Sequence, residues 1–175
     1  MAIAADAIGY LALAVMVLGL VRKDSKHLLL MIAGGVFLWG VHYGMLGSTS
    51  GAIVHGIAGV GVFLAHATYS ARLSHRVLLA GCFSVIGVIA SLYTDINPAN
   101  VAAAVGCVVM TTSQYVLRDA QMRQGFLAGE AAFFVFAAIV GSVPGMLVTI
   151  VNALAGLIGM FRLHRQSLAQ PQVQL

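Results

Sequence analysis

Seven runs of apolar residues, each about as long as a bilayer crossing, follow one another along this chain. A transmembrane helix needs about 20 mostly apolar residues, because its backbone polar groups must bond to one another inside lipid. Hydrophobic residues make up 61% of the 175 residues, and charged residues only 8%. Soluble domains carry about 25% charged residues, so this chain has too little charge to cover a surface in water. The sequence therefore predicts an all-α integral membrane protein.

Short polar connectors separate the seven expected spans. The spans are residues 3–21, 28–46, 52–71, 77–93, 99–117, 126–140 and 146–163. The sixth span is the shortest, and it contains Glu130. The basic connectors are expected at residues 22–27, 72–76 and 118–124.

The positive charges predict how the chain crosses the membrane. All nine Lys and Arg residues lie in alternate connectors or at the C-terminal end, whereas Asp6, Asp95 and two Gly-Ser corners lie on the opposite side. Cytoplasmic loops of membrane proteins are enriched in Lys and Arg. We therefore predict an N-terminus outside and a C-terminus in the cytoplasm, which an odd number of spans allows. The net charge of +4 then reflects membrane orientation, and no nucleic-acid partner is expected.

The pattern of residues 39–63 returns at residues 133–157, a shift of 94 that needs no gap. Four identities fall around the polar break between two apolar runs: Gly47 and Gly141, Ser48 and Ser142, Gly51 and Gly145, Val54 and Val148. Similarity at a fixed shift indicates two copies of one folding unit. Since glycine tolerates positive φ, we expect two equivalent tight corners at residues 47–51 and 141–145.

The shift pairs the first three spans with the last three. Each unit has three helices, so a single linking helix brings the second unit to the same side as the first. The predicted domains are a first triple-helix bundle (1–71), a linker helix (72–97), a second triple-helix bundle (98–165) and a disordered cytoplasmic tail (166–175). Parallel repeats about an axis along the membrane normal are a transporter architecture.

Two segments carry a resemblance to a known family. GVHYGMLGSTSGAIVHGIAG (40–59) and AAIVGSVPGMLVTIVNALAGLIGMFRLHR (137–165) resemble the YgjV family of bacterial inner-membrane proteins. The three-plus-one-plus-three arrangement also resembles the SWEET sugar facilitators and the related PnuC vitamin transporters. This resemblance implies a multi-pass, SWEET-like fold in the inner membrane, with a path for a small solute between the bundles.

The chain departs from the SWEET pattern at two points. The first helix of each SWEET repeat carries a Pro-Gln hinge, whereas residues 3–21 and 99–117 contain no proline. The pocket asparagine of the third SWEET helix is matched by Asn152 alone, because Ala58 occupies the position 94 residues earlier. These departures put both a sugar substrate and the hinge mechanism in question.

Asn152 and His55 are the expected polar contacts for a solute, because polar groups inside hydrocarbon are costly and mark function. His55 lies one turn before Ala58, and residues three apart share a helix face. Asn152 and His55 would therefore approach one axis from opposite repeats. The alternatives are helix–helix bonding by Asn152 and a His55 ring bonded to a backbone carbonyl.

Three aromatic rings are expected to form the walls of the same site. SWEET-type pockets draw an aromatic residue from the second repeat helix, and His42 and Phe136 are the nearest matches by spacing. Trp39 lies one turn before His42, and flat rings stack well on a ring-shaped solute. For Trp39 and Tyr43, an aromatic belt at the membrane interface is the alternative.

Glu130 is an acid within the sixth expected span, whereas Asp6 lies near the outer end of the first. Glu130 is a candidate for proton coupling. The alternative is that its carboxylate reaches back to Arg123 or Arg118 at the cytoplasmic surface.

No constellation in the sequence supports catalysis, a cofactor or a metal site, so we expect a protein that is not an enzyme. Cys82 and Cys107 lie in apolar runs and are expected to be inert core thiols. The predicted function is a transporter or facilitator for a sugar- or vitamin-sized polar solute, by alternating access between the bundles. Lipid is the other expected partner, and the sequence leaves open whether the protein forms a homo-oligomer. The alternative is a non-transporting scaffold or sensor, which would have no polar cavity between its helices.

Overall fold

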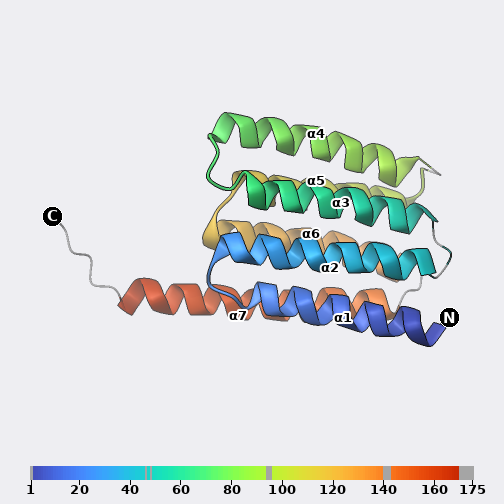
Figure 1. Ribbon diagram of the computed structural model, residues 1–175, viewed down its shortest axis with the longest axis horizontal. Helices are drawn as coiled ribbons and strands as arrows, with labels where there is room; N and C mark the ends of the chain where they lie inside the picture. The colour runs from blue at the N-terminus through green and yellow to red at the C-terminus, as the bar shows by residue number, and fades with distance from the viewer. Residues whose placement is uncertain (1, 46, 48, 94–95, 140–142, 170–175) are drawn as a thin grey trace.

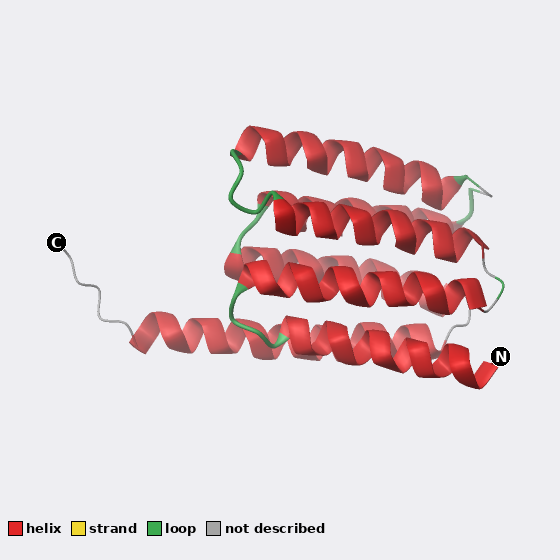
Figure 2. Cartoon of the chain, viewed as in Figure 1, coloured by secondary structure: helices red, strands yellow, loops and turns green. Residues whose placement is uncertain are grey.

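The computed structural model describes residues 2–45, 47, 49–93, 96–139 and 143–169, and these residues form helices and short connectors without a strand (Figures 1 and 2). Seven helices are present: α1 (Ala2–Leu20), α2 (Ser25–Met45), α3 (Thr49–Ala67), α4 (Leu73–Leu92), α5 (Pro98–Val116), α6 (Asp119–Ile139) and α7 (Val143–Ala169). The expectation of an all-α chain with seven helices is confirmed.

Helices α6 and α7 differ from their predicted ranges. Helix α6 begins at Asp119 instead of residue 126, so almost all of the expected connector is helical. Hydropathy misplaced this start because Arg123, which is fully buried, was taken for a surface residue. Helix α7 runs to Ala169 and projects beyond the bundle (Figure 1). Helix α7 therefore extends to residue 169, four residues into the expected tail.

The helices form two layers (Figure 1). Helices α1, α2 and α3 lie side by side in one layer, and α7, α6 and α5 lie in the same order in the other. Helix α1 contacts α7 and α3 contacts α5, so the layers meet along their margins. Helix α4 packs against α3 and α5 and covers one margin of the pair.

The outer surface of the bundle is apolar. Every helix exposes large hydrophobic side chains, for example Leu11 on α1, Ile86 on α4 and Leu154 on α7. Five helical segments of the described chain are long and apolar enough to cross a membrane, and the described parts of α1 and α3 contain shorter apolar stretches. Lipid, rather than water, is the solvent that such a surface requires.

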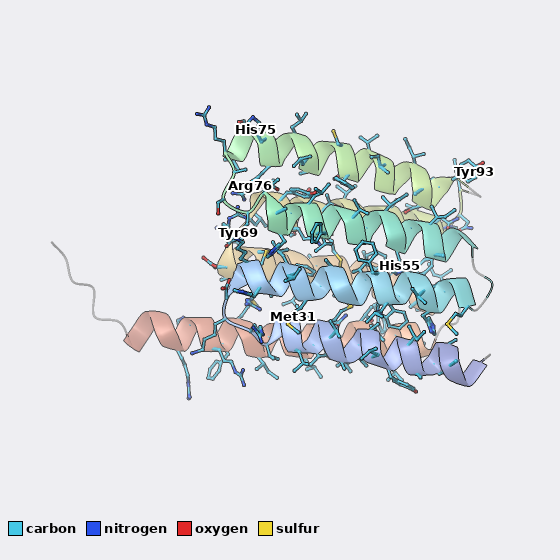
Figure 3. All side chains as sticks on the ribbon, in the orientation of Figure 1. Met31, His55, Tyr69, His75, Arg76 and Tyr93 are labelled. Carbon is cyan, nitrogen blue, oxygen red and sulfur yellow. The ribbon has the colours of Figure 1, made fainter. Side chains whose placement is uncertain are left out.

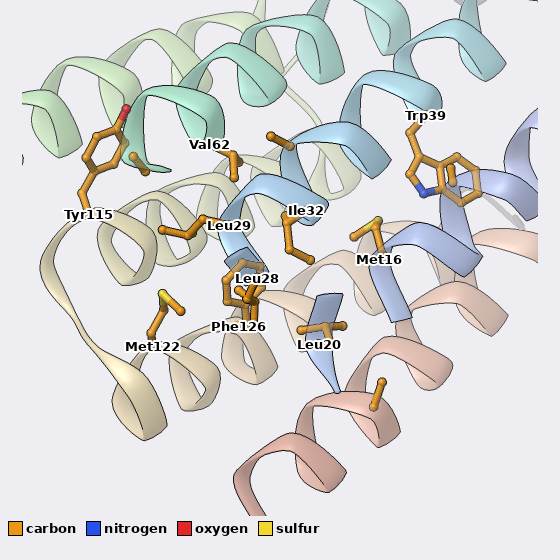
Figure 4. Packing of buried hydrophobic residues seen from close by; sticks show 14 of the residues in the cluster. Met16, Leu20, Leu28, Leu29, Ile32, Trp39, Val62, Tyr115, Met122 and Phe126 are labelled. Atoms are coloured by element: carbon orange, nitrogen blue, oxygen red, sulfur yellow. The ribbon is translucent and has the colours of Figure 1, made fainter. Parts of the chain in front are cut away.

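The two layers are packed tightly at the end of the bundle where α1, α3 and α5 finish, here called the basic end because Arg22, Arg76 and Arg118 lie there. A cluster of buried side chains fills the space between the layers near this end (Figure 4). Leu28 of α2 and Met122 of α6 are among its fully buried members.

Buried arginines close the same end by bonding to helix C-termini. The last carbonyls of a helix lack partners within it and carry partial negative charge. Arg123 donates from Nη1 to the carbonyl oxygen of Leu20 at 2.5 Å, and Arg76 donates from Nε to that of Tyr115 at 2.6 Å. Arg118 donates to a carbonyl just beyond α3. The basic residues therefore act as helix caps that join separate helices.

The contact between α1 and α2 has a counterpart between α5 and α6. A Cβ added to Gly35 would collide with the Met16 side chain, and a Cβ added to Gly129 would collide with that of Met110. Both members of the first contact lie 94 residues before those of the second. Close helix approach at these two sites therefore depends on the absence of a side chain.

Both expected corners fall only partly within the described residues. Gly47, between α2 and α3, has a φ of +81°, a conformation that glycine adopts without strain. Residues 141 and 142 of the second corner lie outside the described residues. The equivalence of the two corners therefore stays a prediction.

Candidate functional site

A cavity of about 340 Å³ lies between the two layers. Residues of α1, α2 and α3 line one side, and residues of α5, α6 and α7 line the other, while α4 contributes Phe83 and Gly87. Small-molecule sites in proteins have volumes of about 300–1,000 Å³. The space between the layers is therefore large enough for a small solute.

An acid and an amide lie together on the wall of this cavity. Asn152 of α7 donates from Nδ2 to Oε1 of Glu130 of α6 at 3.0 Å. Their side chains are only 2% and 6% exposed. The Oδ1 atom of Asn152 has no hydrogen-bond partner among the described residues. Leaving a buried acceptor unbonded costs about 1–3 kcal/mol, so this atom requires an explanation.

Glu130 does not reach back to the basic end. Arg123 and Arg118, its expected partners, bond to backbone carbonyls instead. The early start of α6 explains the difference, because Glu130 lies 11 residues after Asp119, about 16 Å along the helix axis. The carboxyl group is thus near the middle of α6, too deep to snorkel to the surface.

His55 of α3 lies on the cavity wall with Asn152. Its ring centroid is 4.8 Å from that of Tyr43 on α2. The residue lies in the half of α3 away from the basic end, which Tyr69 and Arg76 mark (Figure 3). The structure therefore brings the two residues that the sequence singled out as polar contacts to one space.

Two of the three expected wall residues line the cavity, and one does not. Trp39 and Phe136 are on the wall, and Trp39 is only 8% exposed, which does not fit an interfacial belt. The prediction that His42 forms part of the wall is wrong. Its Nδ1 lies 2.7 Å from the carbonyl oxygen of Ala5, and its ring packs near Gly9. Three residues turn an α-helix by about 300°, so His42 points about 60° away from Trp39, toward α1, and joins α1 to α2.

Several lining residues were not singled out from the sequence as solute contacts. Tyr43 and Thr149 line the cavity, as does Gln114 of the polar stretch late in α5. Thr149 occupies the position 94 residues after His55. Applying the repeat shift to every expected contact, and not only to Asn152, would have found it.

The cysteines differ in their surroundings. Cys107 of α5 is half-buried on the cavity wall, whereas Cys82 of α4 is exposed on the outside of the bundle. The expectation that both are core thiols is therefore wrong for Cys82. No group of three or more His, Cys, Asp or Glu within the described residues is placed to hold a metal ion.

Comparison with known families decides what kind of protein carries this cavity. A family model described as "Imp-YgjV: Bacterial inner membrane protein" matches residues 3–167. The chain belongs to the YgjV family. The resemblance of residues 40–59 and 137–165 to this family is thereby confirmed, and so is the bacterial inner membrane as the location. All residues of the YgjV-type cavity lie within the matched range. Neither the curated proteins nor the solved structures contain a match to this chain.

Proposed function

We propose that this inner-membrane protein is a transporter or facilitator for a small polar solute, which binds in the cavity between the layers. The observation that carries the proposal is Asn152, a residue on the wall of a solute-sized space, whose buried Oδ1 acceptor has no partner among the described residues. The volume of about 340 Å³ equals that of about eleven water molecules in the liquid. A ring-shaped solute of sugar or vitamin size is the class that such a volume suits.

We further propose that the two layers are parallel triple-helix repeats joined by α4. The pairing of lining residues supports this arrangement, since eight pairs on the wall are each separated by 94 residues. The pairs are Met16/Met110, Ile32/Phe126, Val36/Glu130, Trp39/Phe133, Tyr43/Ala137, Val54/Val148, His55/Thr149 and Ala58/Asn152. A cavity on a two-fold axis is expected to have such a lining, because each wall position then occurs twice.

A hydrogen bond supports the position of that axis. Ser25 donates from Oγ to Oδ1 of Asp119 at 2.8 Å, and these residues are themselves 94 apart. In a two-fold arrangement, a residue meets its own equivalent only beside the axis. The axis then passes between the first turns of α2 and α6 and runs along the helices, which is the membrane normal for a bundle of spans.

The closed basic end suggests how the solute site is reached. In the proposed topology the seven helices cross the membrane with the N-terminus outside, so the arginine caps lie at the cytoplasmic surface. Alternating access requires that one layer rocks against the other around the cavity. The inter-layer bonds of Arg123 and Ser25 would then break when the cytoplasmic side opens.

A non-transporting scaffold or sensor is the second candidate. Such a protein gains stability from complete packing, so it should lack a large cavity and should bond its buried polar atoms internally. The Glu130–Asn152 bond fits this alternative, but the cavity and the remaining acceptor of Asn152 favour the transporter. Nothing in the site requires a chemical reaction, so we propose no enzymatic role.

Binding to the Asn152→Ala variant tests the proposal. Purified protein is screened with sugars, vitamins and amines by thermal shift, and the affinity of any solute found is then measured. Loss of one hydrogen bond to the solute should weaken binding about ten- to a hundredfold. Ser91→Ala is the control, since Ser91 is also buried but lies off the cavity wall. Unchanged binding by Asn152→Ala, or no solute for the wild type, would contradict the proposal.

A further inference from the structure

The charges on the cavity wall are of one sign. Glu130 is the only acid among the described lining residues, and neither Lys nor Arg is among them. The nearest turns of α6 toward the basic end carry Arg123, but its guanidinium donates to the carbonyls of Leu20 and Arg22. A carboxylate or phosphate on a solute would therefore find neither Lys nor Arg on this wall, where His55 is the one basic side chain among the described lining residues, while an ionised Glu130 would repel it.

At the acid–amide pair, the atom left without a partner is an acceptor. Asn152 already uses Nδ2 to donate to Glu130, and its Oδ1 has no partner among the described residues. A carboxylate accepts hydrogen bonds at both oxygens and donates none. The pair therefore leaves the buried Oδ1 of Asn152 unsatisfied beside the cavity, so the group that completes it must be a donor.

Aromatic rings surround the same space. Trp39 and Tyr43 line it from α2, and Phe133 and Phe136 line it from α6. The faces of aromatic rings attract cations, with Trp the strongest, and the attraction grows when water is excluded. A neutral apolar body would also pack well against these rings.

We infer that the solute is a small organic cation with N–H donors, such as a primary or secondary ammonium on an apolar body. This inference rests on the proposed function and names its substrate class. The ammonium group lies against Glu130, donates to Oδ1 of Asn152 and faces the rings of α2 and α6. Pairing one positive charge with one carboxylate keeps the loaded cavity neutral, which lowers the cost of charge within the membrane. Anionic sugars and nucleotides are excluded by the same reasoning.

Cys107 offers a built-in reporter of the cavity, because it is on the wall while the chain's other thiol, Cys82, is on the outside. In the Cys82→Ala background, three methanethiosulfonates of similar size are reacted with the purified full chain. One is the neutral methyl reagent, one carries an aminoethyl cation, and one carries a sulfonatoethyl anion. Each rate is divided by the rate of the same reagent with 2-mercaptoethanol, which removes differences in intrinsic reactivity.

The cationic reagent should modify Cys107 at least about tenfold faster than the anionic one, given the strength of charge interactions in a site of low dielectric. Glu130→Gln keeps the shape and the bond to Asn152 but removes the charge, so the ratio should fall toward one. Glu130→Asp should retain the preference. Asp24→Asn is the matched control, since it removes an exposed carboxylate outside the cavity and should leave the ratio unchanged.

Protection by matched solutes completes the test and does not require any variant to fold. Benzylammonium should slow labelling of Cys107 at concentrations about tenfold below those needed for benzyl alcohol, and benzoate should not protect. Equal rates for cationic and anionic reagents, or equal protection by the amine and the alcohol, would overturn the inference but leave a solute cavity standing. If none of the three reagents labels Cys107 until the protein is denatured, the cavity admits no solute and the proposed function fails as well.

Discussion

The layer of α1, α2 and α3 and the layer of α5, α6 and α7 share a framework but differ in chemistry. At two wall positions the second layer carries Glu130 and Asn152 where the first carries Val36 and Ala58. At a third, the first layer carries His55 where the second has Thr149. At these three wall positions the layers differ in their polar groups, whereas the packing pair of Met16 and Gly35 is identical to that of Met110 and Gly129.

The contrast distinguishes residues that pack the helices together from residues that would contact a solute. Gly19 packs against Met31, and Ser113 packs against Gly125 at the equivalent positions, so one small partner is kept at each contact. Helix packing needs only that the combined volume fits. A solute needs particular donors and acceptors, and in the proposed function one acid–amide pair binds one solute.

The largest effect is expected from filling the paired glycine contacts. Gly35→Leu and Gly129→Leu should each lower the free energy of unfolding by about 1–3 kcal/mol or more, because Met16 and Met110 occupy the space. Similar losses in the two layers would support a shared framework. Thermal unfolding of the purified variants measures this. Gly81→Leu is the control, since a Cβ there meets no atom within 4 Å. A large loss at one glycine only would break the comparison.

Moving the acid–amide pair between the layers should have the next largest effect. Glu130→Val with Asn152→Ala should weaken benzylammonium binding by about ten- to a hundredfold. Adding Val36→Glu and Ala58→Asn places the same groups at the equivalent positions and should restore most of the affinity. Calorimetry on the three proteins measures this. Failure of the relocated pair to recover binding would mean that the layers are not interchangeable around the cavity.

Smaller and similar effects are expected from the paired aromatic residues. Trp39→Leu and Phe133→Leu occupy equivalent wall positions, and each should weaken benzylammonium binding by roughly two- to fivefold, from a lost cation–π contribution of about 0.5–1 kcal/mol. Benzyl alcohol titrations serve as the control, because a neutral solute should lose less affinity. If the amine and the alcohol weaken equally, the rings contribute packing alone.

The smallest effect is expected in the connector before α2. A hydrogen bond from His27, 2.5 Å away, lowers the pKa of Asp24, whose equivalent 94 residues later is Arg118. A lowered pKa adds stability above the ordinary Asp value of about 4, and this stability is lost at lower pH. Because the pair is exposed, Asp24→Asn should cost only about 0.2–1 kcal/mol near pH 7. Unfolding midpoints of both proteins at several pH values should converge in acid; a constant difference would contradict the assignment.

Hydropathy was sufficient to predict seven helices, because backbone N–H and C=O groups in lipid must bond to one another and a helix achieves this within one segment. The shift of 94 predicts that Asn152 and His55 lie near one space, and both residues line the cavity. The burial of Arg123 could not be predicted in this way, because hydropathy does not register a guanidinium that bonds to the ends of another helix. The direction of His42 was also missed, since spacing along a helix does not say which neighbour each face meets.

The central claim is that the space between two equivalent layers is a solute site built on Glu130 and Asn152. An experimental structure of the full chain in lipid nanodiscs with millimolar benzylammonium tests it most directly. We expect the amine between the layers, with its nitrogen about 2.7–3.2 Å from Oδ1 of Asn152. A cavity filled by side chains, with this oxygen bonded to another protein group, would contradict the claim.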